Sequence, residues 1–126
     1  MFTSLMKSLS GALTPAPALP SVSVQEARQR VESGAAILVD VRGPSEWAQT
    51  GVALGAECIQ MGTPDFVARL EALRRRHPAR AIDLICRSGA RSGSVQRALG
   101  DMGWTNVVNV RGGTSSWMAA GLPMQR

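Results

Sequence analysis

The chain has few of the residues that stack on bases or bind metal ions. Among its 126 residues there is no tyrosine, phenylalanine occurs twice, and His77 is the only histidine. Proteins that bind single-stranded nucleic acid place several aromatic side chains along a basic groove, and such interleaving is absent here. A zinc site needs a cluster of cysteine and histidine ligands. We therefore expect no nucleic-acid partner, no metal and no other cofactor.

Lysine is also scarce, so the positive charge comes from arginine. Lys7 is the only lysine, arginine supplies 13 of the 14 basic residues, and the formal net charge is +5. This balance favours the recognition of anions. The densest basic cluster, residues 74–77, falls where a helix is expected to end, and basic side chains there complement the helix dipole. We therefore interpret that cluster as a solvated helix terminus.

Cysteines and long apolar runs are few. Cys58 and Cys86 lack C-x-x-C spacing, which argues against a dithiol motif and a disulfide framework. No stretch approaches the roughly 20 apolar residues that span a bilayer, and residues 1–11 do not fit a secretory signal. We expect a cytoplasmic protein without a transmembrane segment, in which Cys58 is a packed strand residue and Cys86 is free and accessible.

The sequence divides into an N-terminal extension and one domain. Apolar residues of segment 1–13 recur at helical spacing, and residues 14–20 form a proline-rich linker, so residues 1–20 are expected to be a flexible or amphipathic N-terminal extension. Residues 21–126 are enough for one α/β domain with a single compact core. In that domain, apolar runs typical of buried strands alternate with helical patterns, which predicts a parallel sheet.

Start and stop signals place these elements. Ser23 and Glu26 form a capping box for a helix that ends at Gly34, and Thr63-Pro64 predicts the start of a helix with Phe66, Val67, Leu70 and Leu73 facing inward. The other helices are expected at 44–49, from Ser92 to Gly103, and at 115–120. Strands are expected at 36–41, 56–59, 82–85 and 107–110. Asp83 is inconsistent with a central strand, because a buried carboxylate needs partners.

The candidate site follows the strand at 82–85 and has the sequence Cys86-Arg87-Ser88-Gly89-Ala90-Arg91-Ser92. A short loop that leads into a helix aims backbone N–H groups inward, so it binds negative charge. A cysteine there is expected to be a thiolate with a lowered pKa, favoured by the helix dipole, Arg87 and Arg91, and to be a nucleophile. A purely packing role is the alternative, but packing gives no reason for such polar surroundings.

Four separated motifs of this chain together resemble the single-domain rhodaneses, a family of sulfurtransferases. They are Asp40-Val41-Arg42 with Glu46, the Cys86 loop, Gly112-Gly113 with Trp117, and Gly121-Leu122-Pro123. The resemblance covers about residues 21–125. It implies a parallel five-stranded sheet flanked by helices on both faces, and a Cys86 that carries a persulfide.

The resemblance also implies the chemistry of the site. Cys86 would take a sulfane sulfur from a small anionic donor such as thiosulfate and pass it to cyanide, a thiol or a protein acceptor. The loop from Arg87 to Ser92 would stabilise the persulfide. Arg87 and Arg91 are candidates for attracting the donor, although either could pair with an acidic residue and Arg91 could mainly brace the loop. Asp40, Arg42 and Glu46 resemble a buried polar cluster that supports the site, while Gly112, Gly113 and Trp117 fit roles in turns and packing.

One detail of the sequence departs from the family pattern, and another separates this chain from related phosphatases. Val52 stands where the family usually has histidine, which would loosen hydrogen bonding near the site. Only four residues separate Cys86 from Arg91, whereas structurally related cysteine phosphatases have five, so phosphatase or arsenate reductase activity is disfavoured. A module that carries sulfur to a protein partner, with residues 1–20 as a docking element and little independent turnover, remains an alternative to an independent enzyme.

Overall fold

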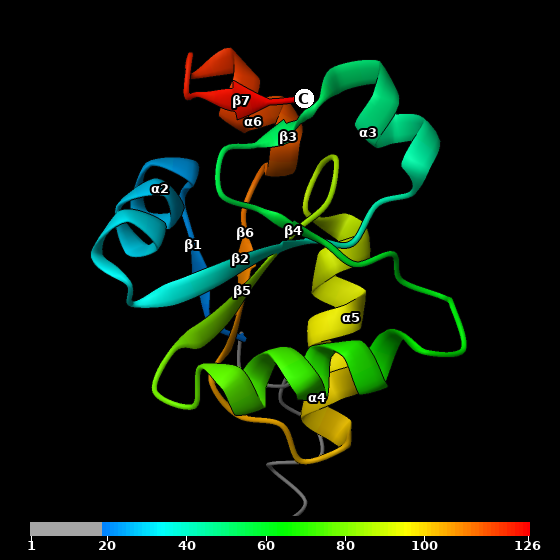
Figure 1. Ribbon diagram of the computed structural model, residues 1–126. Coiled ribbons are helices and arrows are strands. Elements are labelled where there is room, and N and C mark those ends of the chain that lie inside the picture. Colours follow the sequence, from blue (N-terminus) through cyan, green and yellow to red (C-terminus); the bar gives the residue numbers. More distant parts are fainter. Residues whose placement is uncertain (1–18) are drawn as a thin grey trace, which may run out of the picture.

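A five-stranded parallel sheet forms the centre of the computed structural model, which describes residues 19–126 (Figure 1). The strand order is β1-β6-β5-β2-β4, and every neighbouring pair is parallel. The bounds are Ser21–Val22 for β1, Ala36–Asp40 for β2, Glu57–Cys58 for β4, Ala81–Ile85 for β5 and Val107–Val110 for β6. The expected fold class is confirmed, and β5, which precedes the cysteine loop, is the central strand.

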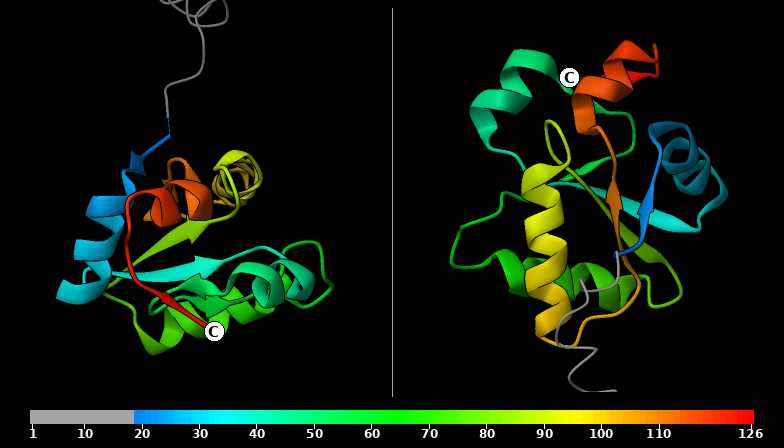
Figure 2. Two further views of the ribbon diagram at one scale, coloured as in Figure 1. Left: turned by 90° about the horizontal axis from the view of Figure 1, so that it is seen from above. Right: turned by 180° about the vertical axis from the view of Figure 1, so that it is seen from behind.

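Helices cover both faces of this sheet, as expected (Figure 2). On one face, α4 and α5 contribute Phe66, Leu70, Leu73, Val95 and Leu99 to an apolar cluster. On the other, α2 and α6 contribute Val24, Ala27 and Trp117. The helices are α2 (Val24–Ser33), α3 (Pro44–Thr50), α4 (Phe66–Arg76), α5 (Ala90–Asp101) and α6 (Gly113–Ala119).

Two short strands outside the main sheet were not expected from the sequence. Strands β3 (Val52–Ala53) and β7 (Met124–Gln125) pair antiparallel near the C-terminus. They join the C-terminal segment to the segment that follows α3. Each has only two residues, so neither contains a repeat of the alternation that identifies a strand in a sequence.

The sequence signals for both ends of α2 and for the end of α4 were interpreted correctly. The Ser23 hydroxyl accepts a hydrogen bond from the Glu26 backbone N–H at 3.1 Å, and α2 ends at Gly34. The basic cluster lies at the end of α4, with Arg74, Arg75 and Arg76 in its last turn. The arginine side chains there complement the partial negative charge of the helix terminus.

The start of α4 and the start of α5 were placed wrongly. Helix α4 begins at Phe66 rather than at Thr63-Pro64, because the Thr63 hydroxyl donates to the Gln60 carbonyl in the preceding turn instead of capping the helix. Val67 is 37% exposed and does not face inward. Helix α5 begins at Ala90 instead of Ser92, because the chain already turns at Gly89, whose φ is 99°.

Asp83 of β5 has the partner that its burial requires. Its carboxylate is fully buried and accepts two hydrogen bonds from the Arg30 guanidinium of α2, at 2.7 and 2.9 Å. The Arg30 side chain remains 29% exposed, so it links the buried carboxylate to solvent. This bidentate pair holds α2 against the central strand and removes the inconsistency noted in the sequence.

Most of the expected N-terminal extension, residues 1–18, lies outside the described residues. The described part of the chain contains no helix that is both long and apolar enough to cross a membrane.

Candidate active site

Three loops meet where β2, β5 and β6 end. Because parallel strands place their carboxyl ends at one edge of the sheet, the turns toward α3, α5 and α6 lie together there (Figure 1). Direct hydrogen bonds join them: the Val41 N–H donates to the Ile85 carbonyl at 3.0 Å, and the Thr114 N–H donates to the Cys86 carbonyl at 2.8 Å. The loop that follows β5 is therefore held from both sides.

The sulfur of Cys86 lies inside the loop that follows it. The backbone N–H of Gly89 donates to Sγ at 3.1 Å, and the Ser92 hydroxyl lies 3.3 Å from it. Cys86 is a free cysteine, but it is only 1% exposed, so the expectation of an accessible thiol was wrong. The loop folds back over the sulfur to bring its N–H groups into range, and this closure shields the thiol from solvent.

The surroundings of Cys86 favour its charged form, as expected. Burial raises the pKa of the thiol, whereas hydrogen bonds from the Ser92 hydroxyl and from the backbone N–H groups of Ser92, Gly89 and Ser88 lower it, and the net pKa lies below its usual value. Hydrogen bonds to an anion stabilise it directly. The hydrogen-bond donors of the loop are therefore the main cause of this lowered pKa.

Helix α6 clamps the backbone of the cysteine loop. The Thr114 hydroxyl donates to the Cys86 carbonyl at 3.0 Å, and the Ser115 N–H donates to the Arg87 carbonyl at 3.0 Å. This contact is close: a Cβ atom on Gly113 would lie 2.5 Å from the Cys86 carbonyl oxygen. Gly112 and Gly113 at the start of α6 thus serve turn geometry and packing, as does Trp117, which is fully buried.

Arg91 is held by α3 rather than directed toward solvent. Its guanidinium forms a bidentate ion pair with the Glu46 carboxylate, at 2.7 and 2.8 Å. The hydrogen bond from Arg91 holds the pKa of Glu46 below its usual value. Of the two alternatives left open for Arg91, the structure therefore places it in a pair with an acidic residue, where it ties the first turn of α5 to α3.

Asp40 and Arg42 form a second, fully buried ion pair at the end of β2. The Arg42 guanidinium donates to the Asp40 carboxylate, with the shortest contact at 2.8 Å, and also to the Gly51 carbonyl at 2.9 Å and the Thr50 hydroxyl at 3.0 Å. These bonds tie the C-terminal end of α3 to the segment that follows β2. Glu46 does not join this pair, since its carboxylate binds Arg91.

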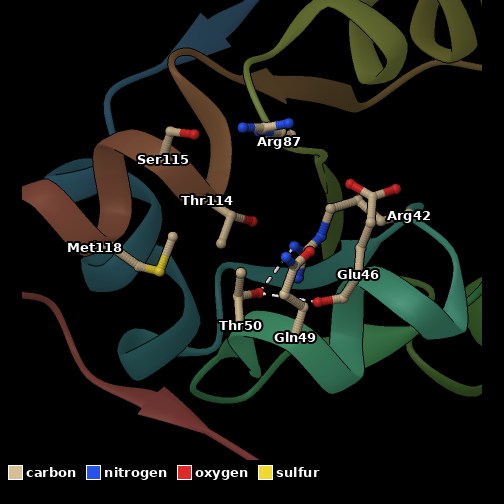
Figure 3. Close-up of a pocket in the computed structure, with 8 residues that line it drawn as sticks. All are labelled: Arg42, Glu46, Gln49, Thr50, Arg87, Thr114, Ser115 and Met118. Carbon is tan, nitrogen blue, oxygen red and sulfur yellow. Dashed lines mark hydrogen bonds between the residues drawn. The ribbon is translucent and has the colours of Figure 1, made fainter.

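A cavity of about 340 Å³ opens between α3, α6 and the cysteine loop (Figure 3). Arg87 is the loop residue that faces it, opposite Gln49 and Thr50 of α3, with Ser115 and Met118 contributed by α6. Within residues 19–126, Arg87 forms no ion pair. It therefore offers a positive charge to a ligand in this cavity.

Several residues of the site were missed by the sequence analysis. Thr114 of α6 and Asn109 of β6 contact the cysteine loop, but no local pattern distinguishes them from other polar residues. Val52, which replaces the expected histidine, is buried in the apolar cluster that also contains Trp47. The Trp47 indole N–H is buried without a hydrogen-bond partner among the described residues.

The fold and the site define a class of proteins: α/β domains with a buried cysteine in an N–H-lined loop at the carboxyl end of the central strand. Residues 23–120 match the family of rhodanese-like domains, and the chain belongs to this family. A sulfurtransferase of Allochromatium vinosum is 33% identical over 88 residues, which are 70% of this chain and 77% of that protein.

Solved structures show the same similarity. The human single-domain sulfurtransferase has a TM-score of 0.59 and 26% identity, over 81% of this chain and 97% of its own. A thiosulfate sulfurtransferase from Pseudomonas aeruginosa has a TM-score of 0.71 over 85% of this chain and 20% of its own, at 22% identity, which shows the fold alone. Family membership supports sulfur transfer as the general class of reaction.

Proposed function

We propose that the protein transfers a sulfane sulfur from thiosulfate, or a similar anionic donor, to cyanide or a thiol through a persulfide on Cys86. One observation supports this most: the sulfur lies among several N–H donors, 3.1 Å from that of Gly89, in a loop whose Arg87 faces the adjoining cavity. These donors suit a sulfur atom that carries negative charge before and after the reaction.

The first step is a nucleophilic displacement at sulfur. The Cys86 thiolate attacks the outer sulfur of thiosulfate, a new S–S bond forms, and the old S–S bond breaks with its electron pair leaving on sulfite. The negative charge of the thiolate moves to the outer sulfur of the persulfide, where the loop N–H groups stabilise it. Arg87 attracts the doubly charged donor into the cavity, and its charge also favours departure of sulfite.

The second step returns the enzyme to its starting state. Cyanide attacks the outer sulfur of the persulfide, a C–S bond forms, and the S–S bond breaks with its electrons returning to Cys86 as thiolate. The product is thiocyanate when cyanide is the acceptor, and a thiol acceptor becomes a persulfide in the same way. Asp40, Arg42 and Glu46 support the site: Arg42 fixes α3, and Glu46 holds Arg91 at the start of α5.

Thiocyanate formation from thiosulfate and cyanide tests this proposal. Cys86→Ser is expected to abolish turnover, whereas the matched variant Cys58→Ser should retain it, because Cys58 lies on β4 at the sheet edge and has a pKa raised mainly by burial. Turnover by folded Cys86→Ser would overturn the proposal.

Removal of the N-terminal extension separates an independent enzyme from a carrier module. We propose that residues 21–126 form the catalytic domain, so deletion of residues 1–18 should leave turnover unchanged. The deletion keeps Pro20, whose carbonyl accepts hydrogen bonds from the Asn109 N–H and the Gln96 side chain. A truncated protein that still forms the persulfide but no longer delivers sulfur would contradict independent turnover and favour the carrier role.

A further inference from the structure

Asn109 of β6 lies beside the cysteine loop and forms hydrogen bonds with two of its residues. Its side-chain oxygen accepts from the Ser92 hydroxyl at 2.6 Å, and its side-chain nitrogen donates to the Gly89 carbonyl at 3.1 Å. The same Ser92 hydroxyl lies 3.3 Å from the sulfur of Cys86. A row of hydrogen-bond contacts therefore runs from Cys86 through Ser92 of α5 to Asn109 of β6.

The Gly89 carbonyl fixes the orientation of the Asn109 amide. A carbonyl only accepts hydrogen bonds, so the NH₂ group must face Gly89 and the amide oxygen must face Ser92. The amide oxygen also only accepts, and a serine hydroxyl has one proton. The hydroxyl can donate to Asn109 at 2.6 Å or to Cys86 at 3.3 Å, but its single proton serves only one of them at a time, so the two acceptors compete for it.

The bond from Ser92 to Asn109 opposes the loop donors that favour the Cys86 thiolate, because taken by itself this bond suits a thiol. A neutral Cys86 donates its S–H to Ser92, and Ser92 donates to Asn109, so every group in the row is paired. A thiolate needs the Ser92 proton for itself. If the proton turns to sulfur, two oxygen atoms face each other at 2.6 Å without a proton between them; if it stays, lone pairs face the anion. Asn109 opposes the thiolate in both cases.

We propose that Asn109 is a positioning residue that holds the Ser92 proton away from Cys86 and thereby limits the fraction of reactive thiolate. This inference rests on the proposed function only for its biological role. The acidity of Cys86 itself can be measured without any sulfur donor. Asn109 thus sets the reactivity of the nucleophile from a neighbouring strand.

Charged groups around the loop do not replace this control. On the loop side, Arg91 interacts with Cys86 electrostatically, but its charge is paired with Glu46 of α3. Arg87 faces the cavity. At the other strand ends, Arg42 after β2 is paired with Asp40, and Arg111 after β6 donates to the Ser21 hydroxyl. Replacement of Asn109 leaves all of these groups in place.

The test titrates Cys86 by the ultraviolet absorbance of its thiolate in a Cys58→Ser background. The chain has no tyrosine, so no phenolate absorbance overlaps the signal. Asn109→Leu keeps a similar side-chain shape and removes both hydrogen bonds. It is expected to lower the midpoint of the titration by about half to one pH unit, which is about three to ten times more thiolate below the midpoint. An unchanged or higher midpoint would overturn the proposal.

A double-variant cycle separates control through Ser92 from a general loosening of the loop. In a Ser92→Ala background, Asn109→Leu should no longer move the midpoint, since no hydroxyl proton is left to compete for. An equal shift in that background would overturn the proposal, because the effect would then run through Gly89. Ser94→Ala is the matched control: Ser94 is exposed on the same helix, donates to the Ala90 carbonyl and should leave the midpoint unchanged.

Two further measurements keep the result interpretable. Far-UV circular dichroism reports whether each variant folds, and Asn109→Ala, which removes the same two bonds with a smaller side chain, replaces Asn109→Leu where that variant does not fold. A lowered midpoint in a protein that fails to turn over thiosulfate would support the role of Asn109 and contradict the proposed function, so the two can fail separately.

Discussion

Gly113 is the residue at which α6 lies closest to the cysteine loop, and Gly113→Ala tests this contact. Its φ is +58°, a left-handed conformation that residues with a Cβ rarely adopt. An added Cβ would lie 2.5 Å from the Cys86 carbonyl oxygen and 2.6 Å from the carbonyl carbon and oxygen of Arg87. These are backbone atoms, so they cannot move aside as a flexible side chain could. Either the loop or α6 must shift.

Two costs add up in this variant. The left-handed conformation costs about 1–2 kcal/mol for a residue with a Cβ. Forcing an extra carbon into a packed contact costs about 1–3 kcal/mol. We therefore expect Gly113→Ala to reduce the free energy of unfolding by about 2–5 kcal/mol, a large part of the roughly 5–15 kcal/mol typical of a domain.

Gly121→Ala provides the matched control. Gly121 has a φ of +70°, but nothing lies within 4 Å of the position its Cβ would take, so it shares only the conformational cost. Urea unfolding followed by tryptophan fluorescence should show that Gly113→Ala is less stable than Gly121→Ala by about 1–3 kcal/mol. Equal unfolding free energies for the two variants would refute the close contact between α6 and the loop.

Three further predictions concern ion pairs and charge. Glu46→Gln should lower the free energy of unfolding at neutral pH by about 0.5–1 kcal/mol, since it weakens the partly exposed pair with Arg91. Because that pair lowers the pKa of Glu46, its stabilising effect is lost progressively as the pH falls from the usual value of 4.5 through the lowered pKa; a difference between wild type and variant that does not narrow as the pH falls below 4.5 would contradict this. Arg87→Gln should raise KM for thiosulfate several-fold more than it changes kcat, with a smaller effect at high salt, and an unchanged KM in steady-state kinetics would argue against donor contact. Arg30→Ala should cost about 3–5 kcal/mol in urea unfolding and more than Asp83→Ala, because it strands a buried carboxylate, whereas Arg30 itself can reach solvent; the reverse order would be inconsistent with this pair.

The sequence predicted those parts of the fold that depend on neighbouring residues. The cap of α2 was correct because Ser23 and Glu26 are three residues apart and interact within one turn. The four strands predicted from apolar runs lie close to β2, β4, β5 and β6. Strands β1, β3 and β7 were not predicted, because each has only two residues and leaves no periodic signal. The start of α4 was misplaced because Thr63 has a competing local partner, the Gln60 carbonyl.

The candidate site shows the same division between local and distant contacts. The Cys86 loop is a continuous segment, so its sequence alone indicated an anion-binding turn. The pairing of Arg91 with Glu46 joins residues 45 positions apart, and it could only be left as an alternative. Asn109 was missed because its relation to Ser92 depends on the order of strands in the sheet, which places β6 next to β5.

Intact mass spectrometry of the reduced protein, before and after thiosulfate, tests the central claim most directly. We predict a gain of one sulfur atom in the wild type and in Cys58→Ser, no gain in Cys86→Ser, and loss of the added sulfur as thiocyanate when cyanide follows. A folded, reduced protein that gains no sulfur from thiosulfate, or that gains it equally in Cys86→Ser, would contradict a persulfide on Cys86.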